Sequence, residues 1–401
     1  MSFRLITVVP VLLGVAFAQL SLGLSTQLIP LLLLQDGTGS TMIGIVGSAY
    51  FVGFLAGALL VPWAVRRVGH VRAFALLAAV CADCALLMVW GHGAVAIAVL
   101  RLITGFASSG IFLIAESWLN DRADSANRGR VFSSYLVTSW GATAAGPLAL
   151  TIVAPSATMF VLVGLGFASA VLPMAATVQP NPQVPRSRRL SPWALARISP
   201  LGLACAGTAG MLNAVFYALI SVYLEQHGHA SATAGIVSAS LVAALLVQVP
   251  VGWLSDRFER RRVTLATLGI GFLAAFALVV LGWPGVWAMA ALATVYAAAT
   301  APLYGLGAGQ TNDRIEREDY VAASGGLLFA WALGASFGPG VVGALMGAVG
   351  PGGLFAFLAA VLAAMMAFTV ARILGRPDAA RLPALTGLPG SVGDAGIQGK
   401  E

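Results

Sequence analysis

Two charged residues, Asp83 and Arg101, lie deep inside long apolar stretches and are the first candidates for chemistry. Asp83 lies nine residues before His92, at a short polar turn, and Arg101 lies nine residues after it. If the two stretches are antiparallel helices, both side chains lie at the same depth, about 13 Å from the turn. A charge at that depth in a membrane costs at least about 2.5–3.5 kcal/mol, so it needs a partner or a function.

Two interpretations of this pair stay open at the level of sequence. In the first, Asp83 and Arg101 neutralise each other as a structural ion pair. In the second, Arg101 faces a cavity, where it binds an anionic group of a substrate or tunes a titrating carboxylate. The two interpretations are compatible if protonation of Asp83 releases Arg101.

A second group of charges lies at the ends of the apolar stretches. Glu116 lies about four helical turns after Arg101. Other charged residues lie in or beside the gaps between stretches that are expected on the same side of the membrane. They are Arg122, Arg128, Arg130, Asp256, Arg257, Arg260 and Arg261. We expect them to form a gate whose contacts exist only in one conformation. The alternative is a set of solvated loops with arginines that extend to the membrane interface.

Neutral polar side chains inside the apolar stretches are further candidates for contact with a substrate. They are Gln19, Gln27, Asn213, Tyr217, Tyr296 and Tyr304. Asn213 and Tyr217 are four residues apart, and Tyr296 and Tyr304 are eight apart, so each pair shares one face of a helix. Hydrogen bonds between helices, at about 0.6 kcal/mol each, would explain the same residues equally well.

The elements that must position these residues are twelve apolar stretches, each long enough to cross about 30 Å of hydrocarbon as a helix. They are 6–34, 41–65, 71–90, 94–119, 131–153, 157–178, 200–224, 232–254, 263–281, 286–310, 321–348 and 354–374. The alternation of a membrane β-barrel is absent from them. The sequence therefore predicts an all-α membrane protein with twelve transmembrane helices.

Composition and charge agree with this fold class. Hydrophobic residues make up 59% of the chain and charged residues 9%, against roughly 25% charged in soluble domains. Apart from Arg101, every Lys and Arg lies at the termini or in alternate gaps between the stretches. Positive residues stay on the cytoplasmic side, so both termini are expected inside, in an inner-membrane protein. The net charge of +7 therefore indicates orientation beside lipid headgroups, and nucleic acid is not an expected partner.

The sequence does not favour an enzyme or a metal site. The three cysteines lie within apolar stretches, and the four histidines lie at helix ends or in loops. An H-E-x-x-H motif and a phosphate-binding G-x-x-x-x-G-K-[ST] loop are both absent from the sequence. We therefore expect no cofactor. The stretch after Arg4 ends in A-x-A like a signal peptide, but it continues to Leu34, so we expect an uncleaved first helix.

The chain consists of two copies of one design. Asn120-Asp121-Arg122 recurs 192 residues later as Asn312-Asp313-Arg314, and Gly146-Pro147 recurs as Gly338-Pro339 at the same offset. Gly44-Ile45-Val46 recurs 191 residues later. We therefore expect two pseudo-symmetric six-helix bundles. Their predicted bounds are 1–178 and 200–374, with a cytoplasmic linker at 179–199 and a disordered cytoplasmic tail at 375–401.

One loop carries a resemblance to a known family. Gly252-Trp-Leu-Ser-Asp256-Arg257-Phe-Glu-Arg260-Arg261 resembles the G-x-x-x-D-R-x-G-R-R loop of the major facilitator superfamily. Arg101-x-x-x-Gly105 is similar to that family as well, and Glu116-Ser117 with Asn127-Arg128-Gly129-Arg130 resembles its YcaD-like branch. The resemblance implies a cavity lined by helices one, four, seven and ten, with Arg101 in proton coupling. In the first half, Arg66 replaces the aspartate of the signature loop.

Small residues and prolines complete the prediction. Gly146-Pro147, Gly334, Gly338 and Pro339 would allow close helix packing and kinks. The family's antiporters carry a similar, more complete motif on helix five, which favours export. We thus expect a monomeric, proton-coupled secondary transporter for a small organic solute, working by alternating access in the lipid bilayer. The alternatives are a lipid translocase, a transporter-shaped receptor, or a proton-coupled uptake symporter.

Overall fold

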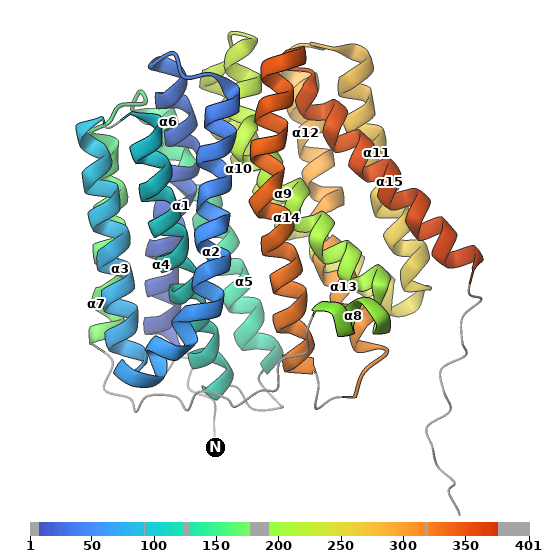
Figure 1. The fold of residues 1–401 in the computed structure, drawn as a ribbon, viewed down its shortest axis with the longest axis horizontal. Coiled ribbons are helices and arrows are strands. Elements are labelled where there is room, and N and C mark those ends of the chain that lie inside the picture. The colour runs from blue at the N-terminus through green and yellow to red at the C-terminus, as the bar shows by residue number, and fades with distance from the viewer. Residues whose placement is uncertain (1–7, 92, 123–127, 177–191, 317–319, 376–401) are drawn as a thin grey trace, which may run out of the picture.

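The computed structural model describes residues 8–91, 93–122, 128–176, 192–316 and 320–375, and these residues form helices and turns with no strand. Figure 1 shows the helices running side by side along one direction. The α-helices are α1 (Val9–Gln35), α2 (Ser40–Val68), α3 (His70–Leu87), α4 (Ala94–Arg122), α5 (Arg128–Ala145), α6 (Ala149–Ile152), α7 (Met159–Ala175), α8 (Pro192–Ile198), α9 (Pro200–Gln226), α10 (Thr233–Arg257), α11 (Arg260–Leu281), α12 (Val286–Thr300), α13 (Leu303–Asn312), α14 (Tyr320–Val349) and α15 (Gly353–Leu374). Short 3₁₀ turns lie at Met88–Trp90, Gly146–Leu148 and Ala230–Ala232.

The predicted fold class is confirmed, because each of the twelve apolar stretches contains a helix. Ten helical segments of the described chain are long and apolar enough to cross a membrane, and α7 is a shorter apolar helix. The remaining stretch is divided into α5, a 3₁₀ turn and α6. The side of the membrane on which the termini lie stays a prediction from charge. The predicted linker is described only from residue 192, where α8 begins, and the predicted tail lies outside the described residues beyond 375.

Two stretches are interrupted at proline. Proline lacks a backbone N–H and disfavours a helical residue before it, so it interrupts the hydrogen-bond ladder. Pro302 lies between α12 and α13, and Pro147 lies in the 3₁₀ turn that follows α5. The stretch at α4, the repeat counterpart of α12 and α13, is one continuous helix. The two halves therefore differ at this element.

The helices form two groups that lie side by side in Figure 1. The first group contains α1 to α5 and α7, and the second contains α9 to α15. We call the end at which α1 and α9 begin and α2 and α10 end the linker side, and the opposite end the far side.

The two groups meet mainly along three helix pairs, α2 with α14, α1 with α9, and α5 with α10, and α2 also contacts α9. Glycine permits the closest of these approaches, since a Cβ added at Gly44 on α2 would lie 2.2 Å from the Pro339 carbonyl oxygen on α14. A Cβ at Gly343 would lie 2.5 Å from the carbonyl oxygen of Ser40. Backbone contact of this kind is how helices associate in lipid, where there is no hydrophobic drive between them. The seam formed by α2 and α14 lies on the far side.

Candidate functional site

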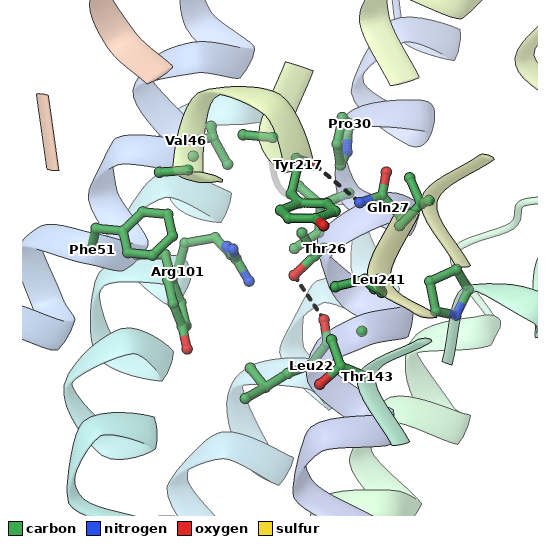
Figure 2. A pocket seen from close by; sticks show the side chains of 18 of the residues that line it. Leu22, Thr26, Gln27, Pro30, Val46, Phe51, Arg101, Thr143, Tyr217 and Leu241 are labelled. Atoms are coloured by element: carbon green, nitrogen blue, oxygen red, sulfur yellow. Dashed lines mark hydrogen bonds between the residues drawn. The ribbon is translucent and has the colours of Figure 1, made fainter. Parts of the chain in front are cut away.

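A cavity of about 240 Å³ lies between the two groups of helices. Its wall is made mainly by α1 and α2, with contributions from α4, α5, α9, α10 and α14, as Figure 2 shows from close by. The polar or charged lining residues are Gln19, Thr26, Gln27, Tyr50, Arg101, Thr143 and Tyr217. The larger apolar ones include Phe51, Phe112, Leu241 and Trp331. The cavity is thus apolar over most of its wall, with one cation.

Arg101 supplies that cation, and it is 6% exposed. Its guanidinium carbon lies 4.4 Å from the centre of the Tyr50 ring, and its Nη1 has no hydrogen-bond partner. No described carboxylate lies within ion-pair distance of it. Figure 2 shows the guanidinium group pointing into the cavity. A buried cation without a counter-charge is costly, which leaves Arg101 available for an anionic ligand.

Glycine in the R-x-x-x-G sequence explains why Tyr50 contacts Arg101. A Cβ added at Gly105, one turn after Arg101, would lie 1.8 Å from the Tyr50 carbonyl oxygen. A Cβ at Gly53 would lie 1.8 Å from the Leu102 carbonyl oxygen. The backbones of α2 and α4 therefore cross at close range, and Tyr50 is brought against the guanidinium group. Aromatic faces attract cations by about 0.5–2 kcal/mol, less than a counter-ion supplies.

The ion pair between Asp83 and Arg101, one of the two interpretations that the sequence left open, is not formed in this structure. Asp83 is exposed on α3, whereas Cys81, two residues earlier, faces α4 with its Sγ 3.8 Å from the Ser108 hydroxyl. Two residues correspond to about 200° around a helix, so Asp83 faces away from α4. The sequence predicts equal depth for the two residues, but in the structure they lie on helix faces that do not meet.

We expect the substitution Asp83→Asn to leave ligand affinity nearly unchanged and stability unchanged or raised. A carboxylate exposed within a membrane-spanning helix, with no ion-pair partner among the described residues, is costly in hydrocarbon, so replacing it with a neutral amide should not lower stability. The measurement is the melting temperature and ligand affinity of the purified variant beside wild type. If Asp83→Asn lowers the melting temperature by several degrees, and replacing Arg101 as well reverses this fall, then the two residues do form an ion pair and the prediction is contradicted.

Three predicted polar residues, Gln19, Gln27 and Tyr217, connect helices or line the cavity. Gln27 is 1% exposed, and its Nε2 donates to the Tyr217 carbonyl oxygen at 2.9 Å, drawn as a dashed line in Figure 2. The Thr143 hydroxyl lies 3.1 Å from the Gln19 Oε1. The first contact joins α1 to α9, and the second joins α1 to α5. The Gln27 Oε1 has no partner.

The other three predicted polar residues are absent from the cavity wall. Tyr296 is buried against Phe216, at 5.2 Å between ring centres, and its hydroxyl has no partner. Asn213 is half-buried on α9, one turn closer to the linker side than Tyr217. Tyr304, on α13, lies near Glu116 and interacts with it electrostatically. The break between α12 and α13 separates Tyr296 and Tyr304, which sequence spacing alone placed on one face.

Sequence reasoning missed Tyr50, Phe51, Phe112 and Thr143, which line the cavity. Aromatic residues in an apolar helix look the same whether they face lipid, a neighbouring helix or a cavity. The glycines of the α2–α4 crossing, Gly53 and Gly105, were the available signal for Tyr50. Trp331 also lines the cavity, and its ring is 5.8 Å from Phe51 and 6.1 Å from Phe54.

Glu116 lies one turn from Phe112 toward the linker side, on the same face of α4. It is exposed, and its Oε1 accepts a hydrogen bond of 3.2 Å from the Tyr135 hydroxyl on α5. Tyr304 approaches from the second group of helices. Arg130 is exposed at the start of α5. The side chains of Arg122 and Arg128 lie outside the described residues.

The predicted gate residues of the second half contact one another, within one group of helices. Arg260 lies 3.3 Å from Asp256 and 2.9 Å from Asp313, where the α10–α11 loop meets the end of α13. Arg257 lies over the Trp253 ring at 3.9 Å, and Arg261 donates to the Arg372 carbonyl oxygen. These contacts hold the second group together on the linker side, and none of them crosses to the first group.

The predicted packing residues lie at helix crossings. A Cβ at Gly146 would lie 2.3 Å from the Leu20 carbonyl oxygen on α1, and Pro147 lines the cavity. A Cβ at Gly334 would lie 2.1 Å from the Gly207 carbonyl oxygen, and one at Gly338 would lie 2.7 Å from Val215. Gly334 and Gly338 therefore pack α14 on α9. Pro339 contacts α2 at Gly44 and Gly47.

Twelve helical stretches in two groups around a central cavity define a membrane transporter rather than an enzyme. The family model of the Major Facilitator Superfamily matches residues 11–245 and 204–391. The chain belongs to this superfamily. It is 27% identical over 380 residues to the MFS-type transporter YcaD of Salmonella typhi, covering 90% of this chain and 94% of the relative. It is 29% identical over 359 residues to YcaD of an Escherichia coli strain, covering 87% and 91%.

Solved structures of this superfamily show the same fold. A mutant of the nucleoside transporter NupG matches with a TM-score of 0.79 at 13% identity, over 91% of this chain and 99% of that one. A bacterial homologue of the human lysosomal transporter Spinster, solved inward-facing and unoccupied, gives 0.72 at 15% identity, over 93% and 95%. The human organic anion transporter MFSD10 gives 0.63 at 17% identity, over 90% and 98%.

Proposed function

We propose that this chain is a secondary active transporter that moves a small organic anion across the inner membrane by alternating access. The observation that carries this proposal is Arg101, a buried cation without a counter-ion in the cavity between the two groups of helices. An anionic substrate would supply the missing charge through charge-assisted hydrogen bonds, which a guanidinium group makes in pairs.

The contacts between the groups indicate a state open toward the linker side. Three hydrogen bonds join described residues of the two groups: Gln27 to Tyr217, Ser238 to Ala144, and the Gly340 amide to the Ser48 hydroxyl. All three lie on the far-side halves of their helices. On the linker side, Glu116 is exposed. The positive residues of the linker side place it in the cytoplasm, so the proposed state is open to the cytoplasm.

Glu116 supports a closure of the linker side that depends on pH. Among the described residues, Glu116 is the carboxylate on the face of α4 between the cavity and the linker side. The titratable groups that face it are Tyr135 on α5 and Tyr304 on α13. Closing the linker side would press α13 toward α4 and remove water from Glu116. Removing water disfavours a charged carboxylate. Closure then takes up a proton from the cytoplasm and reopening returns it there, so Glu116 makes closure of the linker side depend on pH.

We expect Glu116→Gln to remove the pH dependence of linker-side closure. If closure takes up one proton, the ratio of closed to open protein rises up to tenfold for each unit by which pH falls. Glutamine resembles the protonated acid, so the variant should close at every pH. Spin labels at exposed Ser133 on α5 and Ser324 on α14 would report the distance, with Glu225→Gln as the control. An unchanged pH response in Glu116→Gln contradicts the assignment.

The test of the proposed function is a thermal-shift screen of purified wild type and Arg101→Ala against panels of anionic, neutral and cationic metabolites. At a ligand concentration of 100 times Kd, binding stabilises the folded protein by about 2.7 kcal/mol. This stabilisation raises the melting temperature. Anions that stabilise wild type alone support the proposal. Stabilisation by neutral compounds only, equal in both proteins, contradicts it.

Direction and coupling follow from transport by reconstituted protein. We propose export by proton exchange, because the Gly146-Pro147 motif resembles that of the family's antiporters. Stimulation of efflux by an inward proton gradient supports exchange, and stimulation of uptake by the same gradient favours a symporter. The alternative of a lipid translocase fits the cavity poorly, since about 240 Å³ is below the 300–1,000 Å³ range of drug-sized ligand pockets. We propose a monomer, which light scattering of the purified protein tests.

A further inference from the structure

Two buried polar atoms of the cavity are left without partners, and they differ in kind. Nη1 of Arg101 is a cationic donor, and Oε1 of Gln27 is an acceptor. The assignment of the Gln27 amide follows from its contact, because the Tyr217 carbonyl oxygen can only accept, so Nε2 must face it. Buried groups of this kind almost always have a hydrogen-bond partner, because leaving one without a partner is costly.

Two other polar lining residues bind protein groups. The Thr143 hydroxyl lies within hydrogen-bond distance of Gln19 and of the Ser139 carbonyl oxygen, and the Thr26 hydroxyl donates to the Leu22 carbonyl oxygen. Arg101 and Gln27 therefore carry the buried unsatisfied atoms of the wall, one that needs an anion and one that needs a hydrogen-bond donor.

Aromatic rings make up the wall beside Arg101. Tyr50 lies against one face of the guanidinium group, and Phe51 packs edge-on against Trp331. Phe112 also lines the cavity, and Tyr217 lies across from Arg101 in Figure 2. Such walls pack a flat apolar ring with about 0.5–1.5 kcal/mol beyond the burial of its area.

Size limits the ligand to one ring. A cavity of about 150 Å³ holds benzene. The cavity here is about 240 Å³, which leaves room for a carboxylate and a small polar substituent but not for a second ring.

We propose that the cargo is a single-ring aromatic monocarboxylate with a hydrogen-bond donor, such as a hydroxyl or amino group, remote from the carboxylate. The carboxylate binds Arg101, the ring lies among Tyr50, Phe51 and Trp331, and the donor binds the Gln27 Oε1. This assignment rests on the proposed transport function and adds the class of substrate to it.

The experiment is isothermal titration of the purified full chain with five probes. They are 4-hydroxybenzoate, 4-hydroxycinnamate, 4-methoxybenzoate without the donor, 4-hydroxybenzamide without the anion, and 6-hydroxyhexanoate without the ring. At least one of the first two is expected to bind wild type about tenfold tighter than each of the last three. Losing the donor or the anion leaves a buried group unsatisfied, and losing the ring removes the contact with the aromatic wall.

Two variants assign the contacts. Gln27→Met should reduce the preference for 4-hydroxybenzoate over 4-methoxybenzoate to about one, whereas Arg101→Met should remove the preference for the acid over the amide. Gln226→Met, an exposed glutamine at the end of α9, should keep both preferences. A melting curve of each variant without ligand shows whether it is folded. If Gln27→Met does not fold, Gln27→Glu provides the second test, because its carboxylate should still prefer the hydroxyl donor.

Three results overturn the assignment. They are equal affinity of wild type for the hydroxyl and methoxy acids, a preference that survives Gln27→Met, and tight binding of 6-hydroxyhexanoate. If aliphatic anions bind in an Arg101-dependent way, the proposed anion transport stands and the aromatic class fails. If no carboxylate binds while neutral compounds do, both proposals fail together.

Discussion

Arg101→Met is expected to abolish binding of anionic substrates while leaving the melting temperature unchanged or raised. A bidentate contact between guanidinium and carboxylate combines two charge-assisted hydrogen bonds of about 1.5–3 kcal/mol each. Its loss corresponds to at least about a hundredfold in affinity. Stability should not fall, because the residue is a buried cation with no carboxylate partner among the described residues.

The direction of the stability change separates the two sequence interpretations. A structural ion pair would make Arg101→Met destabilising by about 3–5 kcal/mol, since one charge would be left buried. The exposed position of Asp83 predicts no such loss. Arg101→Lys is the matched control, because it keeps the charge but loses the planar fork. It should bind anions more weakly than wild type and more tightly than Arg101→Met. A large fall in melting temperature for Arg101→Met, with anion binding retained, contradicts the role given to this residue.

Hydropathy and charge predicted the helices well because both act through the bilayer, which imposes a fixed thickness and one polarity on each stretch. The depth of Asp83 and Arg101 followed from the same rule. The direction in which each side chain points could not be predicted in this way. Successive residues are about 100° apart around a helix, and knowing a residue's depth does not tell which face of the helix it lies on. Asp83 therefore faces away from Arg101.

The candidate site could be predicted only in part for a related reason. Arg101 and Gln27 stood out because polar side chains are rare in apolar stretches. Tyr50 and Phe112 did not, because what places them in the cavity is the crossing of α2 and α4 at Gly53 and Gly105. The separation of Tyr296 from Tyr304 depends on the break at Pro302, whose effect on helix direction is not encoded in spacing.

Gly44→Leu is expected to reduce transport to background by preventing closure of the far side. The added Cβ would lie 2.2 Å from the Pro339 carbonyl oxygen and 3.0 Å from the Gly343 Cα, so α2 and α14 must separate. A transporter that cannot close one side cannot alternate. Overpacking of this kind costs about 1–3 kcal/mol in the closed state. The state open on the far side does not need the contact, so the protein should fold and shift its population toward that state.

The repeat supplies the control for this variant. Gly235 is the counterpart of Gly44 in the second half, and a Cβ there would meet nothing within 4 Å, so Gly235→Leu should transport normally. A cysteine placed at Ala218, which contacts Gly47 at the seam, would report closure, after the three buried native cysteines are replaced. An impermeant maleimide added from the far side should label it in Gly44→Leu and much more slowly in wild type. Equal labelling of the two proteins would mean that the α2–α14 seam does not close the far side, and the proposed direction of opening would then be wrong.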